Sequence, residues 1–297
     1  MIKIAITGST GWLGRSANAA ILQLIKSGHD LHVENYSSKP ADVCLIDGFQ
    51  YRTKTYDQLN NSIFDLYIPL GFPTQEKYQI LGKNEYKLSI DLLVERDIKS
   101  ILNNPLAKVL LISSGVVNQL SESQSTNYGY EFYAKMKVMQ EEYLTESVGV
   151  DNLSVCYLYS CTSKDIRDFN SYAFSSMVKK AIYNENIHIS NALPVIRKYV
   201  DLRELFTVML LEILSGKTFR ISSGGQKIEI GELANLIVKV TNSSSKISRA
   251  TQGSDAKSDL YYSEDACFEE LFQAHNFRYS NLNAQLENVI AAVRTFA

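Results

Sequence analysis

The sequence predicts an α/β fold built on a doubly wound parallel sheet, and two observations carry this prediction. Short apolar segments alternate with amphipathic ones through the first half of the chain, as in strands joined by crossover helices. The first strand, residues 2–6, runs directly into a turn that contains Gly8, Gly11 and Gly14. A strand, a glycine-rich turn and a helix in this order are typical of the opening unit of a Rossmann-type domain.

The other elements of the first half follow from apolar periodicity and from the residues that end each run. The helix after the turn spans residues 13–27 and ends at Gly28. Residues 42–54 form either a hairpin about Asp47-Gly48 or one strand after a loop, and the sequence leaves both open. The remaining expected elements are strands at 31–36, 65–70, 108–112 and 153–159 and helices at 88–102 and 130–147, with the strand at 153–159 completing the sheet.

Beyond residue 160 the alternation of strands and helices becomes looser. We expect helices at 172–183, 202–214, 230–240 and 283–296 and strands near 187–189 and 219–221. No linker-like stretch and no internal repeat interrupts this part. The sequence therefore predicts a Rossmann domain at 1–160 and, at 161–297, mainly a small C-terminal α/β lobe with some segments that return to the large sheet.

Composition narrows the class of protein. The 297 residues are 45% hydrophobic and carry a net charge of −2, which gives no electrostatic case for binding nucleic acid or an anionic membrane. The chain opens on a strand and has no apolar run of membrane-spanning length, so we expect a cytoplasmic protein. The four histidines form no cluster, and the four cysteines lack metal-ligand spacing, so we expect reduced thiols and no metal site: Cys44, Cys156, Cys161 and Cys267.

The glycine turn has the spacing that a dinucleotide site needs. Gly8 permits the tight turn, Gly11 lets a pyrophosphate approach the backbone, and Gly14 lets the helix pack closely on the strand. The charge of the ligand then meets the N-terminus of the helix. The sequence therefore predicts that a nicotinamide dinucleotide binds here.

Three polar residues predict proton chemistry beside that ligand. Ser114 ends the strand that begins at residue 108, and Tyr133 and Lys137 lie four residues apart on the helix that follows, so they share one face. An ammonium about 4 Å from a phenol stabilises the phenolate by up to ~4 kcal/mol at an effective dielectric near 20. We expect Lys137 to lower the pKa of Tyr133 toward neutral pH and to hold the nicotinamide ribose, while Ser114 bonds the reacting carbonyl or hydroxyl.

With these motifs in order, the chain resembles the extended short-chain dehydrogenase/reductases of the nucleotide-sugar epimerase/dehydratase type. The likeness extends to the segment Arg197–Leu202 and to Ile221–Gly224 followed by Ile230–Ala234, and so covers nearly the whole chain. It implies that Ser114, Tyr133 and Lys137 form a catalytic triad, and that Arg197 contacts the diphosphate of a nucleotide-sugar, which suits an arginine fork. Together with the fingerprint it implies cofactor contacts from Tyr133 and Lys137 and from the following residues: Gly8, Thr10, Gly11, Trp12, Leu13, Gly14, Arg15, Asn35, Ser37, Ser38, Lys39 and Leu70.

Departures from the family pattern narrow the reaction. Members often have His-Leu-Ala-Ala where this chain has Pro69-Leu70-Gly71-Phe72. The acidic pair of the dehydratases and the cysteine of the 3,5-epimerase/reductases are both missing after Ser114, where Gly115 and Val116 stand. What remains is hydride transfer at a sugar carbinol or ketone. We favour a 4-ketoreductase, by family analogy, over a 4-epimerase, which the same residues support.

The choice of cofactor depends on the end of the second strand. A carboxylate there binds the 2′-hydroxyl of NAD and repels the 2′-phosphate of NADP. The aligned residue is Asn35, Lys39 and Arg15 lie near it, and Glu34 points to the opposite face by strand alternation. The sequence therefore favours NADP over NAD.

Three further expectations remain open. The family resemblance implies a homodimer, and Phe132, Met136, Met139 and Tyr143, on the helix of Tyr133, are either core or part of that interface. A relative that reduces a non-sugar carbonyl is one alternative to a nucleotide-sugar enzyme. A non-catalytic dinucleotide sensor is another.

Overall fold

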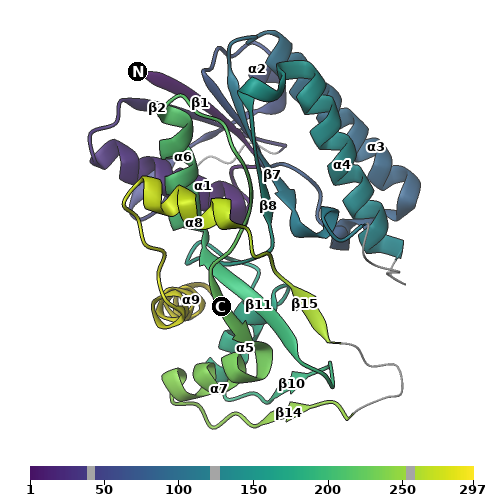
Figure 1. Ribbon diagram of the computed structural model, residues 1–297, viewed down its shortest axis with the longest axis vertical. Helices are drawn as coiled ribbons and strands as arrows, with labels where there is room; N and C mark the ends of the chain where they lie inside the picture. Colours follow the sequence, from purple (N-terminus) through teal and green to yellow (C-terminus); the bar gives the residue numbers. More distant parts are fainter. Residues whose placement is uncertain (39–43, 121–127, 252–257) are drawn as a thin grey trace. The chain divides into compact units, whose positions relative to one another are not determined.

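The computed structural model describes residues 1–38, 44–120, 128–251 and 258–297. The chain divides into two compact units. Unit 1 comprises Met1–Leu158 and Phe206–Ser222, and unit 2 comprises Tyr159–Leu205 and Ser223–Ala297. Each unit contains β-sheet and flanking helices (Figure 1).

Unit 1 contains a parallel sheet of, among the described residues, seven strands in the order β12-β8-β7-β6-β1-β2-β5. The chain runs outward from β1 first through β2 and β5, and then in the other direction through β6, β7 and β8, which is a doubly wound arrangement. The predicted fold class is therefore confirmed. The strands are β1 (Ile2–Thr7), β2 (Leu31–Ser37), β5 (Thr53–Thr55), β6 (Leu66–Pro69), β7 (Lys108–Ser114), β8 (Leu153–Leu158) and β12 (Arg220–Ser222).

The expectation that the strand at 153–159 completes the sheet is wrong. β12 adds parallel to β8 and extends the sheet by one strand, with Ile221 opposite Cys156. A strand of three residues has too little alternation to show where it pairs, so its position could not be derived from its own pattern.

Two helices of unit 1, α3 and α4, are longer than apolar periodicity suggested. The helix expected at 88–102 begins at Gln75, because a first polar segment is joined to it at Gly82, whose φ of 73° interrupts the helical backbone. The open alternative at 42–54 is a hairpin, β3 (Cys44–Ile46) and β4 (Phe49–Tyr51), turning at Asp47 and Gly48, and β5 follows it. The helical segments are α1 (Trp12–Lys26), α2 (Tyr56–Leu59), α3 (Gln75–Leu102), η1 (Gly115–Val117), α4 (Tyr128–Val148), η2 (Val150–Asn152) and the larger part of α6 (Leu202–Leu214).

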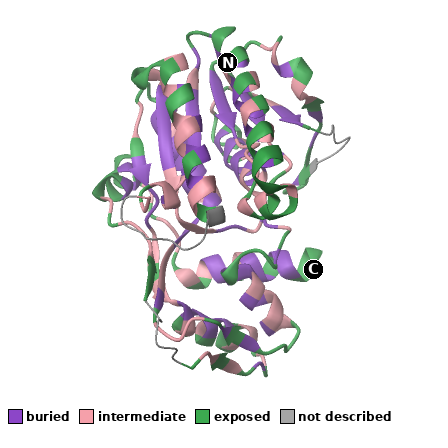
Figure 2. Ribbon diagram, turned by 90° about the vertical axis from the view of Figure 1, so that its right-hand side faces the viewer, coloured by how far each residue is buried: buried purple, intermediate pink, exposed green. Residues whose placement is uncertain are grey.

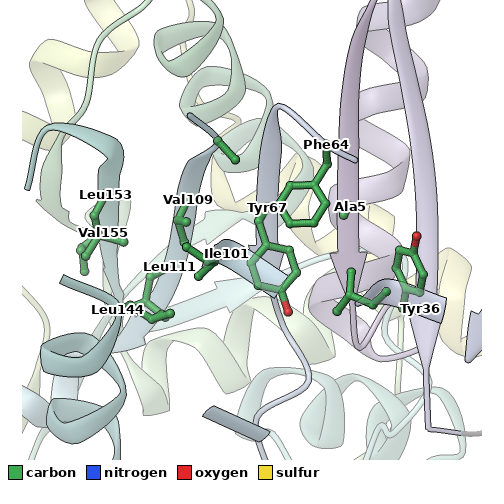
Figure 3. Packing of buried hydrophobic residues seen from close by; sticks show 12 residues of the cluster. Ala5, Tyr36, Phe64, Tyr67, Ile101, Val109, Leu111, Leu144, Leu153 and Val155 are labelled. Carbon is green, nitrogen blue, oxygen red and sulfur yellow. The ribbon is translucent and has the colours of Figure 1, made fainter. Parts of the chain in front are cut away.

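The two faces of the sheet are covered by different helices. Asn35 of β2 bonds to Asn18 of α1, whereas the next residue, Tyr36, belongs to an apolar cluster with Ile101 of α3 and Leu144 of α4. Because neighbouring strand residues point to opposite faces, α1 lies on one face and the α3–α4 pair on the other. Figure 3 shows this cluster and Figure 2 the buried strands of the sheet, while α3 and α4 run side by side (Figure 1).

Unit 2 is organised around β11, which pairs antiparallel with β13 and parallel with β9 and β15. Within the described residues the sequence missed β9, β11, β13, β14, β15 and α8. Four of these strands have only three or four residues, too few to show a clear period. The elements of unit 2 are β9 (Ser160–Thr162), α5 (Ala173–Ile182), β10 (Ile187–Ile189), β11 (Val195–Asp201), β13 (Gln226–Glu229), α7 (Ile230–Thr241), β14 (Ile247–Arg249), β15 (Asp259–Tyr261), α8 (Ala266–Ala274) and α9 (Leu282–Phe296).

Two features of the described residues bear on the class of protein. No helix in them is both long and apolar enough to cross a membrane. No group of three or more His, Cys, Asp and Glu side chains in them is placed to hold a metal ion. Cys156, Cys161 and Cys267 are thiols.

Candidate active site

The glycine turn after β1 is tightly packed against the loop after β6. Gly8 has a φ of 66°, and a Cβ at this position would lie 2.5 Å from the carbonyl oxygen of Leu70. A Cβ on Gly14 would lie 2.4 Å from the carbonyl oxygen of Gly8, so α1 approaches the turn as closely as the sequence predicted. The amide of Leu70 in turn donates to the carbonyl of Thr7 at 3.1 Å. The turn and the β6 loop therefore form one packed edge.

The start of α1 has the features of an anion site. Gly11 caps the helix without a side-chain hydrogen bond, and no acidic residue stands in the first turn. The first amides of a helix and its macrodipole both favour a negative group at that end. Around this end, Thr10, Trp12 and Leu13 are half-buried, and the guanidinium of Arg15 donates to the carbonyl of Thr10. The expected pyrophosphate-binding residues thus lie together.

The end of β2 differs from the expectation for the adenosine ribose. Asn35 is buried, and its amide exchanges two hydrogen bonds with that of Asn18, at 2.8 and 2.9 Å. An amide engaged in both directions and covered by α1 is a packing residue, so the expected ribose contact of Asn35 is not supported. Ser37 is also buried and donates to Thr53, whereas Ser38 is exposed, and Lys39 lies outside the described residues.

Glu34 points away from this end of the predicted cofactor site, as strand alternation predicted. Its carboxylate accepts hydrogen bonds from Lys54 at 2.7 Å and from the hydroxyl of Tyr36 at 2.5 Å. Burial raises the pKa of Glu34, but the bonds from Lys54 and Tyr36 outweigh it, so that pKa is lowered overall. Glu34 therefore stays ionised and occupied on the other face of β2.

Ser114 and Tyr133 meet at the carboxyl end of the sheet. Ser114 is the last residue of β7, and Tyr133 lies on α4, which packs against β7. Their side chains are hydrogen-bonded. Burial raises the pKa of Tyr133 to about 12, and the bond from Ser114 opposes this rise only partly. The predicted pair is thus assembled, but the phenol is held in its neutral form.

Lys137 follows Tyr133 by one helical turn and is buried, with 5% of its surface exposed. Its ammonium donates to the carbonyl of Ile112 at 3.1 Å and to Oε1 of Gln140 at 3.3 Å, and it lies 3.8 Å from the centre of the Phe72 ring. Burial lowers the pKa of Lys137 to about 7, and the Asp97 carboxylate partly opposes this.

The expected lowering of the Tyr133 pKa is therefore not found. A lysine favours a phenolate only when its charge is near the phenol oxygen. Here the ammonium of Lys137 is directed to Ile112, Gln140 and Phe72, and burial, which disfavours the charged form of both groups, dominates each pKa.

A buried charge pair on α3 is the main feature that the sequence did not reveal. Asp97 is fully buried and accepts from Arg96 at 2.8 Å and from the hydroxyl of Tyr67 at 2.6 Å. Burial raises the pKa of Asp97, although Arg96 and Tyr67 counter it. Adjacent opposite charges in an amphipathic helix resemble a solvated surface pair, so no signal in the sequence singled out Asp97.

The aromatic and sulfur side chains of α4 are mostly core. Met136 is buried, and Phe132 and Met139 pack against the cluster of Tyr86, Ile90, Leu93 and Val94 that joins α4 to α3. Tyr143 is the exception, with 45% of its surface exposed.

Arg197 belongs to unit 2 and has partners there. Its guanidinium lies 2.5 Å from the Asp259 carboxylate and also donates to the backbone carbonyls of Asp259 and Ile196. β15 brings Asp259 beside Arg197 because Asp259 pairs with Val195, two residues before it on β11. The predicted anion-binding arginine therefore already has a carboxylate partner.

Comparison with known proteins identifies the fold. The chain covers all of a UDP-glucose 4-epimerase from Thermus thermophilus, solved with NAD, and is itself fully covered, at 13% identity and a TM-score of 0.72. Two UDP-N-acetylglucosamine 4-epimerases are comparably similar. The enzyme from Methanobrevibacter ruminantium M1, solved with UDP-N-acetylmuramic acid, has 16% identity, a TM-score of 0.74 and coverage of 99% of this chain and 98% of the other. For the Bacillus cereus enzyme the values are 14%, 0.71, 100% and 98%.

At these identities the likeness establishes a shared fold over the whole length, and it confirms the sequence-derived resemblance at that level. No protein-family model matches the sequence, and no curated protein matches it either.

Proposed function

We propose that this chain is an NAD(P)-dependent oxidoreductase of the extended short-chain dehydrogenase/reductase type that transfers hydride at a carbinol or ketone of a nucleotide-sugar. One observation carries the proposal: Ser114 and Tyr133 are hydrogen-bonded at the carboxyl edge of the sheet. The glycine turn lies at the same edge, and the buried Lys137 follows Tyr133 by one helical turn. The fold shared with UDP-sugar 4-epimerases supports it.

Each residue has a distinct role in this proposal. A bound nicotinamide dinucleotide supplies or accepts the hydride. Ser114 donates to the reacting oxygen of the substrate, and Tyr133 gives a proton to that oxygen or takes one from it. Lys137 holds the ribose next to the nicotinamide and, when its charge turns toward Tyr133, stabilises the phenolate. Because the pKa of the buried Tyr133 phenol is about 12, the lysine charge must move toward it before it can act as a base at neutral pH.

Within this class we propose a 4-ketoreductase. The short turn η1 places Gly115 and Val116 directly after Ser114, and neither side chain can move a proton at carbon. A 4-epimerase uses the same residues, and the names of the proteins with similar folds favour it. The two differ in stoichiometry: a reductase consumes one dinucleotide for each sugar converted, whereas an epimerase regenerates its dinucleotide.

We propose NADP as the preferred cofactor. Glu34, the carboxylate nearest the end of β2, is held on the opposite face by Lys54 and Tyr36, so no acidic group of β2 repels a 2′-phosphate. Asn35 no longer supports this preference, because it is buried against Asn18. The NAD found with the Thermus thermophilus enzyme makes NAD the alternative.

We further propose a cytoplasmic homodimer that pairs through the α3–α4 helices. Leu88 and Leu92 of α3 are four residues apart and 58% and 59% exposed, and Tyr143 of α4 is also exposed. Large apolar side chains exposed together on a helix are typical of an interface. The molar mass in solution, measured by light scattering, tests this: a value near twice the 33.4 kDa of the chain supports the dimer.

A reductase of a non-sugar carbonyl is the second candidate, and the pairing of Arg197 with Asp259 favours it. A guanidinium that already has a carboxylate partner is less available to a diphosphate. A thermal-shift titration separates the candidates: NADP⁺ and NAD⁺ are added first, then UDP-, GDP-, CDP- and dTDP-sugars.

Stabilisation by a dinucleotide and by one nucleotide-sugar supports the proposal. Stabilisation by a dinucleotide alone would support either the non-sugar reductase or the dinucleotide sensor. No stabilisation by either dinucleotide contradicts the proposed function.

A further inference from the structure

The Lys137 ammonium has three close neighbours among the described residues. An ammonium has three N–H donors. Two of them go to the carbonyl of Ile112 and to Oε1 of Gln140, and the ammonium also lies over the Phe72 ring, 3.8 Å from its centre. Phe72 also meets the ring of Tyr133 edge to face, with the ring centres 5.8 Å apart. One aromatic side chain therefore contacts both groups of the proposed proton chemistry.

Phe72 stands on the loop that packs against the glycine turn. It follows β6 by three residues, directly after Leu70 and Gly71. A Cβ on Gly71 would lie 3.6 Å from the amide nitrogen of Gly8, and the carbonyl of Leu70 approaches Gly8 even more closely. The glycine turn, where the proposed dinucleotide would bind, therefore packs against the same short segment that carries Phe72.

The strength of the contact depends on its burial. The attraction of a cation to an aromatic face is stronger when water is excluded from the contact than when the contact is exposed. Lys137 is 5% exposed, and Phe72 is half-buried against the α3–α4 cluster of Tyr86 and Met136. The ammonium side of this contact is therefore shielded from water, and the ammonium keeps its two hydrogen bonds beside it.

We propose that Phe72 competes with the cofactor ribose for the Lys137 ammonium, so that a dinucleotide must displace the Phe72 ring in order to bind fully. The proposal rests on the proposed function, because it takes Lys137 as the ribose-binding residue. Displacement of the ring also frees the side of the ammonium that can then turn toward Tyr133. Phe72 is in this sense a positioning residue, which keeps the lysine away from the phenol until the ribose replaces the ring.

The competition predicts an effect that depends on one part of the ligand. ADP-ribose and ADP share the adenosine and the diphosphate, and differ in the second ribose. Replacing Phe72 by leucine removes the aromatic face and keeps apolar volume. We expect Phe72→Leu to bind ADP-ribose and NADP⁺ about tenfold more tightly than the wild-type protein does and to bind ADP with unchanged affinity. Calorimetry measures each affinity.

A matched control exists on α4. Phe132 is also half-buried, packs against the same α3–α4 cluster and has a lysine, Lys83, 5.5 Å from its ring centre. Phe132→Leu makes the same change without touching Lys137, and we expect it to leave all three affinities unchanged. A second variant, Phe72→Met, repeats the test with a different shape in case leucine disturbs the loop.

The outcomes separate the two proposals. Equal binding of ADP-ribose by Phe72→Leu and the original chain, or weaker binding by both Phe72 variants, overturns the competition while the proposed function stands. Tighter binding of ADP as well as ADP-ribose also overturns it, because the ring then affects the turn and not the ribose. If none of the ligands binds either protein, the proposed function itself fails.

Discussion

Lys137 in unit 1 and Arg197 in unit 2 are the two cations that the sequence assigned to ligands, and their surroundings differ in kind. Lys137 is buried among a carbonyl, an amide oxygen and an aromatic ring, and the charge of Asp97 only partly opposes the effect of burial on its pKa. Arg197 lies 2.5 Å from a carboxylate that is itself half exposed. The first cation is costly to keep charged, and the second is already neutralised. Motif spacing therefore locates a charge, but its neighbours decide whether a ligand can use it.

The largest expected effect, on turnover, concerns the phenol of Tyr133. Tyr133→Phe removes the hydroxyl bonded to Ser114 while keeping the ring against Phe72. We expect turnover of a carbonyl substrate to fall by about 10²–10⁴-fold, the usual contribution of a general acid or base, with dinucleotide affinity nearly unchanged. Steady-state kinetics and calorimetry measure the two. Tyr143→Phe, on the exposed side of the same helix, is the control. Unchanged turnover in Tyr133→Phe would exclude the assigned role.

The free-energy cost of burying the Lys137 ammonium predicts that the stability of the protein depends on pH. The pKa of Lys137 is about 7 in the folded chain, lowered by burial from an ordinary value of 10.5. Unfolding therefore takes up a proton between about pH 7 and pH 10.5, and the cost of burying the ammonium is full below this window and disappears above it. We expect the free energy of unfolding of Lys137→Met to exceed that of the wild-type protein by roughly 2–4 kcal/mol at pH 6. This difference should shrink steadily toward pH 10.

Denaturant unfolding at a series of pH values measures this difference. Lys135→Met is the matched control, because Lys135 is exposed and is paired with Glu131 one turn away. Its stability difference should stay within about 0.5 kcal/mol and vary little with pH. A constant difference between Lys137→Met and the original chain would mean that Lys137 is not strained by burial.

The next effect concerns the other cation. Under the nucleotide-sugar hypothesis, Arg197→Leu removes a charged fork from the diphosphate, and nucleotide-sugar affinity should fall by about 1.5–3 kcal/mol. Dinucleotide affinity should not change, and both are measurable by calorimetry. Lys198→Leu, at the next position of β11 and paired with Glu264, is the control. An unchanged substrate affinity in Arg197→Leu would favour the non-sugar carbonyl.

The sequence predicted the parts of both regions that depend on local pattern. The glycine turn, the doubly wound parallel sheet and the meeting of Ser114 with Tyr133 follow from residue spacing and from the alternation of strands and helices. It did not predict contacts that join distant segments. Asn35 was expected at a ribose but pairs with Asn18, and Lys137 was expected beside the phenol oxygen but faces Phe72 and Gln140. Such pairings depend on how distant segments pack together, and the periodicity of the sequence carries no information about that packing.

Asp259 shows the same limit, and it carries the smallest predicted effect. Nothing in its own sequence context pointed to Arg197, and the two meet only because β15 pairs with β11. An ion pair with one exposed partner is worth about 0.2–1 kcal/mol. If the carboxylate competes with a diphosphate for the guanidinium, Asp259→Asn should raise nucleotide-sugar affinity by about two- to fivefold and leave dinucleotide affinity unchanged. The same change in an Arg197→Leu background should have no effect on affinity, because the competitor then has no cation to occupy. An equal gain in both backgrounds would show that Asp259 acts on the ligand directly, and Arg197 would then be a structural partner of β15.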